Sequence, residues 1–200
     1  GYGQVENARE RAYEAARKAV ALDPSSPRAE FALGWAHYVS GNRESFLRSM
    51  MDAIRLNPND AGRLGQAGPH MIWAGEEELG KTLLDKAWQL NPHYPPWQNL
   101  GYADYHMSRR EYEQALDYVE KCLAGQANNP AALFWRASLL GHLGRGEEAG
   151  PSIAEFIETW PAMAADVKGW LGRYHADDAK IEHYLEGARK AGFVAPDALN

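Results

Sequence analysis

The feature that most constrains the fold of this chain is a short phrase ending in proline that recurs at a fixed interval. It closes at Pro24, Pro58 and Pro92, 34 residues apart both times, as Ala-Leu-Asp-Pro, Arg-Leu-Asn-Pro and Gln-Leu-Asn-Pro. Asn129-Pro130 and Trp160-Pro161 continue the series at spacings of 38 and 31 residues. A period of this length is typical of one supersecondary unit stacked on copies of itself. The chain is therefore expected to repeat a single structural unit.

Each unit has the pattern of two amphipathic helices joined by a tight turn. Apolar residues recur at helical spacing over residues 28–40, Gly41-Asn42 supplies a break, and the apolar pattern resumes over residues 43–56. The residue before a proline avoids the α region, so each Asn-Pro or Asp-Pro ends the second helix of its pair. We therefore predict an all-α fold of antiparallel helix pairs without a β-sheet.

The positions of small residues within the unit carry a family resemblance. One unit shows Leu33-Gly34, a turn glycine at Gly41, Ala53 and the closing Pro58. Three later units repeat the pattern with Gly68, Gly75, Gly80, Leu84, Ala87 and Pro92, then Trp97, Leu100, Gly101, Tyr112, Ala115, Val119 and Cys122, then Leu133, Ala137, Gly144, Ala149, Ile153 and Pro161. This pattern resembles the tetratricopeptide repeat (TPR) family. The resemblance implies a solenoid of helix pairs wound into a right-handed superhelix.

The spacing also predicts how the chain is divided. TPR repeats are expected over residues 1–161, as a partial first repeat at 1–24 followed by repeats at 27–58, 61–92, 94–127 and 130–161. Residues 162–200 lack the small-residue pattern, and we expect a capping hairpin of two helices at 162–174 and 178–191, with a tail, because the end of a solenoid needs a polar outer face. Pro69 and Pro151 fall inside expected helices, where each should cause a bend.

Composition excludes several classes of function. The 21 basic residues are scattered among 27 acidic ones, and the net charge of −6 argues against nucleic-acid binding. No apolar run approaches the ~18 residues of a membrane span. The single cysteine, Cys122, excludes an internal disulfide and is expected to be a buried packing residue, which favours a cytoplasmic location. Because no Met opens the chain, we expect an excised piece of a longer protein.

No pattern of catalytic or metal-binding residues stands out. The seven histidines form no His-x-x-x-His pair, and the single His-x-x-Glu pair, His183 and Glu186, has no third ligand nearby in sequence. Nucleophile-elbow, phosphate-loop and dinucleotide motifs are also missing. We predict no catalytic residues, no metal site and no cofactor, and we expect structural or solvated roles for the histidines.

The TPR resemblance implies where a partner would bind, because the first helix of each pair lines the concave face of a TPR array. It places the following residues in an aromatic groove: Arg28, Phe31, Trp35, Tyr38, Ile72, Trp73, Gln98, Tyr102, Tyr105, His106, Phe134, Ser138 and His142. Trp35, Trp73 and Tyr105 are expected to align along one surface as binding anchors. The alternative is that several of these rings pack between helices. Phe31 and Trp35 stand where chaperone-binding TPR modules carry charged residues, which argues against a carboxylate clamp.

The function predicted from this resemblance is protein–protein interaction. The partner is expected to be a peptide, another protein or another domain of the same polypeptide. Residues 90–97 (LNPHYPPW) and 184–192 (YLEGARKAG) resemble the C-terminal TPR regions of bacterial class III adenylate/guanylate cyclases and of winged-helix regulators. Three alternatives stay open: a small-ligand-sensing regulatory domain attached to a cyclase or transcription regulator, a homodimer, and an enzyme with an unfamiliar site.

Overall fold

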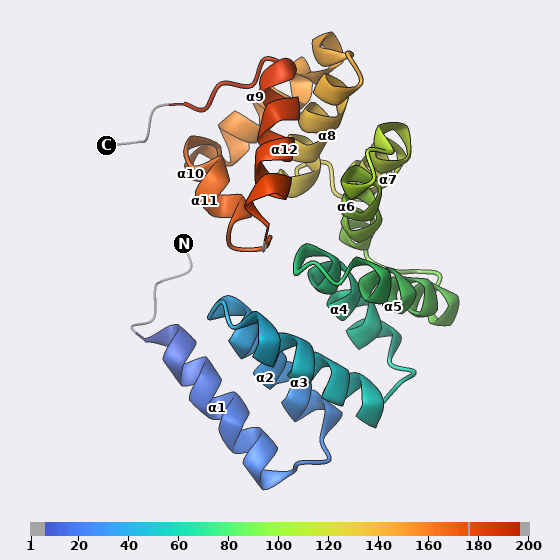
Figure 1. Cartoon of the computed structure of the whole chain (residues 1–200), viewed down its shortest axis with the longest axis vertical. Coiled ribbons are helices and arrows are strands. Elements are labelled where there is room, and N and C mark those ends of the chain that lie inside the picture. The colour runs from blue at the N-terminus through green and yellow to red at the C-terminus, as the bar shows by residue number, and fades with distance from the viewer. Residues whose placement is uncertain (1–6, 176, 197–200) are drawn as a thin grey trace.

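The computed structural model describes residues 7–175 and 177–196, and every regular element in this part of the chain is helical. The helices follow one another around an open arc (Figure 1). In chain order they are α1 (Ala8–Leu22), α2 (Pro27–Val39), α3 (Arg43–Leu56), α4 (Ala61–Trp73), α5 (Glu77–Leu90), the 3-10 helix η1 (Pro96–Gln98), α6 (Asn99–Ser108), α7 (Tyr112–Gly125), α8 (Pro130–His142), the 3-10 helix η2 (Gly146–Ala149), α9 (Gly150–Thr159), α10 (Pro161–Ala165), α11 (Val167–Leu171) and α12 (Asp178–Lys190). The prediction of an all-α solenoid is confirmed.

Successive helices pack as pairs, α2 with α3, α4 with α5, α6 with α7 and α8 with α9. α1 packs on α2, where the second helix of the partial first repeat was expected. None of the helices in the described residues is both long and apolar enough to cross a bilayer.

The turn within each pair uses a residue in the left-handed region. Gly41, Gly75 and Gly144 have φ of 72°, 90° and 72°, values that cost glycine little because it has no Cβ. The third pair has Arg110 in this place, at φ 60°. The amide three residues past the helix then donates to a carbonyl of the last turn, as from Asn42 to His37 at 2.9 Å. The helix ends are thereby satisfied by the backbone itself.

Glycine allows the closest helix contacts. A Cβ on Gly68 would lie 2.9 Å from the carbonyl oxygen of Gly80, which is where α4 crosses α5. A Cβ on Gly141 would overlap the carbonyl oxygen of Gly187, where α8 crosses α12. Both crossings therefore depend on the missing side chain of glycine.

The two prolines differ in position. Pro69 lies inside α4, as predicted, and the helix continues through it to Trp73. Pro151 lies in the first turn of α9 rather than inside a helix, because η2 precedes α9 as a separate element. A proline in the first turn sacrifices no intrahelical hydrogen bond, so no bend is required there.

The C-terminal segment is also less regular than a simple hairpin. Residues 162–174 form two short helices instead of one, because Asp166 leaves the helical region and its side chain caps α11 by accepting from the Gly169 amide at 2.9 Å. α12 packs on α8, and Tyr174 and His175, which follow α11, lie beside α2 and α4. There the Tyr38 hydroxyl donates to the Tyr174 carbonyl at 3.4 Å.

A buried ion pair holds this return in place. Asp104 of α6 is fully buried and its carboxylate lies 2.6 Å from Lys180 Nζ and 2.5 Å from the Tyr184 hydroxyl, both on α12. Lys180 also lies 3.1 Å from Glu77 of α5. Burial works to lower the pKa of Lys180, but the carboxylates of Asp104 and Glu77 outweigh it and hold that pKa above its usual value. The C-terminal segment is therefore tied to the middle of the array.

Candidate partner-binding pocket

A cavity of about 340 Å³ lies between α4, the start of α6, α8 and the C-terminal segment. Its size falls at the lower end of the range of ligand pockets. Its walls are mostly aromatic and contain no Lys, Arg, Asp or Glu; the lining residues are His70, Trp73, Trp97, Leu100, Asn129, Pro130, Ala131, Trp135, Met163, Trp170, Leu171, Tyr174 and His175.

Edge-to-face contacts hold the pocket rings in place. The centroid of the His70 ring lies 4.6 Å from that of Trp73 and 6.1 Å from that of Trp97. Trp73 in turn lies 6.2 Å from Trp135 and 6.2 Å from Tyr174. Such pairs are each worth ~0.5–1.5 kcal/mol beyond the area they bury. The wall is therefore preformed in the free protein.

Three buried nitrogen atoms of the lining residues lack a hydrogen-bond partner among the described residues. They are the indole nitrogens of Trp73 and Trp135 and Nδ1 of His175. Buried polar atoms in proteins are normally paired, and an unpaired one costs ~1–3 kcal/mol. The two indole N–H groups can only donate. Because all three atoms are buried, a ligand in the pocket would reach them only if neighbouring side chains moved.

The pocket is electrically neutral at physiological pH. Burial lowers the pKa of His70 to about 4, against a smaller opposing effect of its hydrogen bond to the Gln66 carbonyl. Nδ1 of His70 donates in that bond, at 2.8 Å, so Nε2 keeps its lone pair. Burial also lowers the pKa of His175. The lining thus favours an uncharged group over an acidic or basic one.

Of the predicted groove residues, Trp73 alone lines this pocket. Trp35 and Tyr38 lie next to it, because their ring centroids are 4.4 and 5.1 Å from that of His70. Phe31 packs against Trp35 at 5.9 Å, and Arg28 is exposed on the first turn of α2. This part of the predicted groove therefore continues the pocket along α2.

Tyr105 and its neighbours in α6 belong to a different cluster. The His106 ring stacks on Tyr118 of α7 at 5.5 Å, as does the Tyr102 ring at 4.9 Å. The Tyr105 hydroxyl donates to Glu78 of α5 at 3.1 Å. Trp35 and Trp73 are thus brought together around His70, while Tyr105 packs elsewhere, so the contacts do not align all three as expected.

The remaining predicted residues are mostly core. Ile72, Gln98, Phe134 and Ser138 are between 0 and 3% exposed, and Tyr102 is 5% exposed. For these residues the alternative of packing between helices describes the structure, because their faces of α4, α6 and α8 turn towards neighbouring helices. His142 is half-buried against Tyr112 and His183. Cys122 is fully buried, which raises the pKa of its thiol to about 12.

The sequence analysis missed His70, Trp135, Trp170 and Tyr174 as pocket residues and used Trp97 only as a repeat marker. The pocket takes its residues from the last turn of α4 but from the beginning of α8 and from η1. Residues at equivalent positions of successive repeats therefore do not all face the pocket. In the sequence, the tryptophans near the ends of the expected helices were a signal that could have pointed to it.

A family model of the tetratricopeptide repeat matches residues 3–61 and 100–164, more than half of the chain. The chain therefore belongs to the tetratricopeptide repeat family. The intervening stretch contains α4 and α5, which pack as a pair like the others.

Two curated proteins are similar to this chain. An Arabidopsis thaliana protein CTR9 homolog is 27% identical over 97% of this chain and 18% of its own length. The TPR repeat-containing protein YpiA of Bacillus subtilis is 26% identical over 66% of this chain and 31% of its own length. The chain thus spans less than a third of the length of either relative.

Solved structures share the fold. A Pseudomonas aeruginosa PilF structure superposes with a TM-score of 0.68 at 23% identity, covering 94% of this chain and 82% of the other. PilW, a type IV pilus biogenesis factor, gives 0.68 at 20% identity over 94% and 84%. YrrB, described as a TPR protein with an unusual peptide-binding site, gives 0.58 at 20% identity over 90% and 92%.

Proposed function

We propose that this chain is a protein-interaction module that receives a large apolar side chain of its partner in the pocket between α4, α8 and the C-terminal segment. The preformed aromatic cavity of about 340 Å³ is the observation that carries the proposal. Membership of the TPR family supports it, and so does the peptide-binding site named for the structural neighbour YrrB.

The chemistry of the lining indicates what the partner presents. A neutral, ring-lined pocket suits an aromatic or long aliphatic side chain. Since no Lys or Arg lines the pocket, an acidic tail would find no charge partner there. Trp35 and Tyr38 extend the contact surface along α2.

A comparison of two aromatic truncations tests this proposal. Peptides are first selected from a random library for binding to the wild-type chain. Their affinity is then measured for Trp97→Ala, which lies inside the pocket, and for Tyr105→Ala, a half-buried aromatic in the separate cluster. Truncating a central anchor costs ~2 kcal/mol or more, which is roughly a 30-fold loss of affinity. We expect that loss for Trp97→Ala and little change for Tyr105→Ala.

Melting temperatures separate loss of binding from loss of folding in the same experiment. If Tyr105→Ala weakens binding while Trp97→Ala binds normally, the partner uses the α5–α7 cluster and the pocket proposal is wrong. Affinity that falls only in proportion to unfolding would also contradict it.

The same pocket supports a second candidate, a small uncharged aromatic ligand sensed by a regulatory domain. The apolar, ring-lined walls favour this alternative. A thermal-shift screen with indole-type fragments distinguishes the two: stabilisation by free fragments without selection of any peptide would favour ligand sensing.

The wider context of the chain is a further proposal. Because both curated relatives are much longer, we infer that the chain serves as a regulatory or scaffold region of a larger protein, for which a cyclase or a winged-helix regulator stays a prediction. The open reading frame upstream of Gly1 tests it. A cytoplasmic location and a homodimer also stay predictions; a solution mass near twice 22.3 kDa would confirm the dimer.

A further inference from the structure

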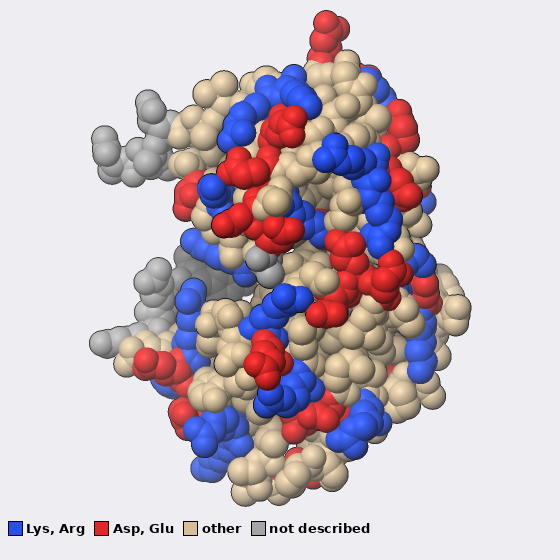
Figure 2. Space-filling model, in the orientation of Figure 1, with Lys and Arg blue, Asp and Glu red and all other residues tan. Residues whose placement is uncertain are grey.

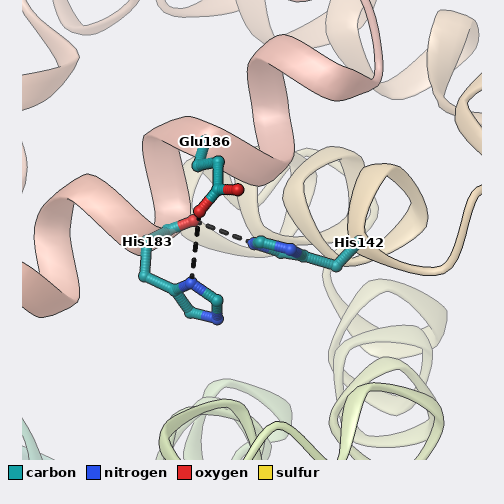
Figure 3. Close-up of side chains that lie close together, drawn as sticks. All are labelled: His142, His183 and Glu186. Carbon is teal, nitrogen blue, oxygen red and sulfur yellow. Dashed lines mark hydrogen bonds and ion pairs between the residues drawn. The ribbon is translucent and has the colours of Figure 1, made fainter.

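Where the end of α8 packs against α12, two histidines and a glutamate from the two helices come together. His183 and Glu186 lie one turn apart on α12, and His142 ends α8 (Figure 3). One ligand atom from each lies within 4.8 Å of the others, and within residues 7–175 and 177–196 this is the one such group of three. In the sequence His183 and Glu186 have no third ligand nearby, and tertiary structure supplies one, His142, from 41 residues away.

The distances leave room for an ion between the side chains. Nδ1 of His183 lies 3.8 Å from Oε2 of Glu186, too far for a hydrogen bond. Ligand atoms bound to Zn²⁺ at ~2.0–2.1 Å in a tetrahedron are roughly 3.3 Å apart. Nε2 of His142 is directed to the same place, where it donates to the His183 carbonyl at 2.9 Å (Figure 3). Metal binding through Nε2 would replace this hydrogen bond, with the imidazole proton moving to Nδ1. Small side-chain rotations would bring all three atoms to bonding distance.

Tyr112 of α7 orients both histidines. Its ring stacks on His142 with centroids 4.8 Å apart and planes 5° apart. Its hydroxyl lies 3.2 Å from Nε2 of His183. A tyrosine hydroxyl can accept as well as donate, so it can hold His183 in the tautomer with the proton on Nε2. In that tautomer the Nδ1 lone pair faces Glu186. A hydrogen bond at the other ring nitrogen, such as the one from His183 to Tyr112, is common for metal-bound histidines.

The environment of Glu186 also suits a ligand. Glu186 is ionised and exposed, and Lys190 pairs with its Oε1 at 2.8 Å, which leaves Oε2 facing the histidines.

We propose that His142, His183 and Glu186 form a Zn²⁺ site, with water in the fourth position. Two imidazoles and one carboxylate are a ligand set that zinc accepts, whereas Mg²⁺ and Ca²⁺ require oxygen ligands. The ion would tie α8 to α12 and so fasten the C-terminal segment onto the repeat array. The site is separate from the aromatic pocket and independent of any partner.

Titration calorimetry of the full 200-residue chain with ZnCl₂, and with MgCl₂ for comparison, tests the proposal. We expect saturable binding of one Zn²⁺ per chain, a raised melting temperature with Zn²⁺, and no response to Mg²⁺. Glu186→Gln and His183→Gln should each abolish the saturable binding. Tyr112→Phe keeps the stack but loses the hydroxyl, and should weaken Zn²⁺ binding by roughly tenfold or more.

His93→Gln is the matched control, because it removes an exposed histidine outside the cluster and should bind Zn²⁺ as the wild type does. Glu186 is an exposed residue of α12, so Glu186→Gln is expected to fold, which circular dichroism checks. Equal Zn²⁺ affinity in the wild-type, Glu186→Gln and His183→Gln proteins would overturn the proposal. So would a loss of binding in His93→Gln alone.

Discussion

At the scale of single residues, neighbours determine what each aromatic ring or histidine does. Phe134 and Trp73 were expected to serve the same groove, yet Phe134 packs in the core against Phe156 and Trp170 while Trp73 lines the pocket. The rings of Trp35, Tyr38 and Trp73 surround His70. The pH at which His70 takes up a proton therefore reports on how well these rings shield it from water.

We predict that His70 makes the protein less stable in mild acid. Its folded pKa of about 4 lies below the ~6.5 of an unfolded histidine, so the unfolded chain binds the extra proton first as pH falls. The stabilising effect is fully present above pH ~6.5 and is lost as pH falls towards 4, by up to roughly 3 kcal/mol. The melting temperature of the wild type should drop over this range, and that of His70→Gln should drop less.

His93→Gln serves as the comparison, since His93 is exposed. If the wild type and His70→Gln lose stability in parallel between pH 6.5 and 4, the enclosed neutral state of His70 is not what the structure indicates.

At the scale of helices, glycine fixes how close two elements approach. α12 packs along α8, with the Ser138 hydroxyl donating to the Tyr184 carbonyl at 2.8 Å. The Trp135 ring stacks on Tyr184 at 5.0 Å along the same contact. This crossing requires Gly141 and Gly187 to face each other without side chains.

Gly141→Ala should therefore loosen α12. The added methyl would overlap the Gly187 carbonyl and lie 2.9 Å from the Ala191 amide nitrogen, both of them backbone groups that cannot turn aside. Overpacking of this kind costs ~1–3 kcal/mol, which lowers the melting temperature of a chain this long by several degrees. Gly150→Ala is the control, because a methyl there meets nothing within 4 Å. A melting temperature equal in the two variants would show that the crossing tolerates a side chain.

At the scale of the whole molecule, the C-terminal segment folds back onto the middle of the repeat array. It supplies Trp170, Tyr174 and His175 to the pocket and anchors itself through Lys180 to Asp104. On the face shown in Figure 2, basic and acidic side chains are interspersed, with no basic tract of the kind that phosphate binding needs. The pocket is therefore shaped by the return of the C-terminal segment onto the repeat array and not by surface charge.

Breaking the buried ion pair should open this closure. Lys180→Met leaves the Asp104 carboxylate buried without its cation, which typically costs ~3–5 kcal/mol. Hydrogen exchange should increase across residues 167–190 before the rest of the chain unfolds. Lys121→Met removes an exposed pair with Asp117 and should cost under ~1 kcal/mol. Unchanged exchange in Lys180→Met would show that the segment is held by packing alone.

The sequence by itself determined the repeat architecture. The proline period, the turn glycines and the small residues at helix crossings are local signals, because a turn or a close contact within one hairpin depends on residues a few positions apart. The same local reasoning placed Cys122 in the core and identified His183 and Glu186 as a pair.

Only the tertiary structure decided which of those residues share a site. Which face of each helix turns inward depends on how successive pairs rotate against one another, and that rotation is set by packing between residues far apart in the chain. It brought Trp73, Trp97 and Trp135 together, separated them from Tyr105, and buried Phe134. The same packing places Lys180 beside Asp104 and His142 beside His183. These contacts span 76 and 41 residues, so the spacing of residues in the sequence does not reveal them.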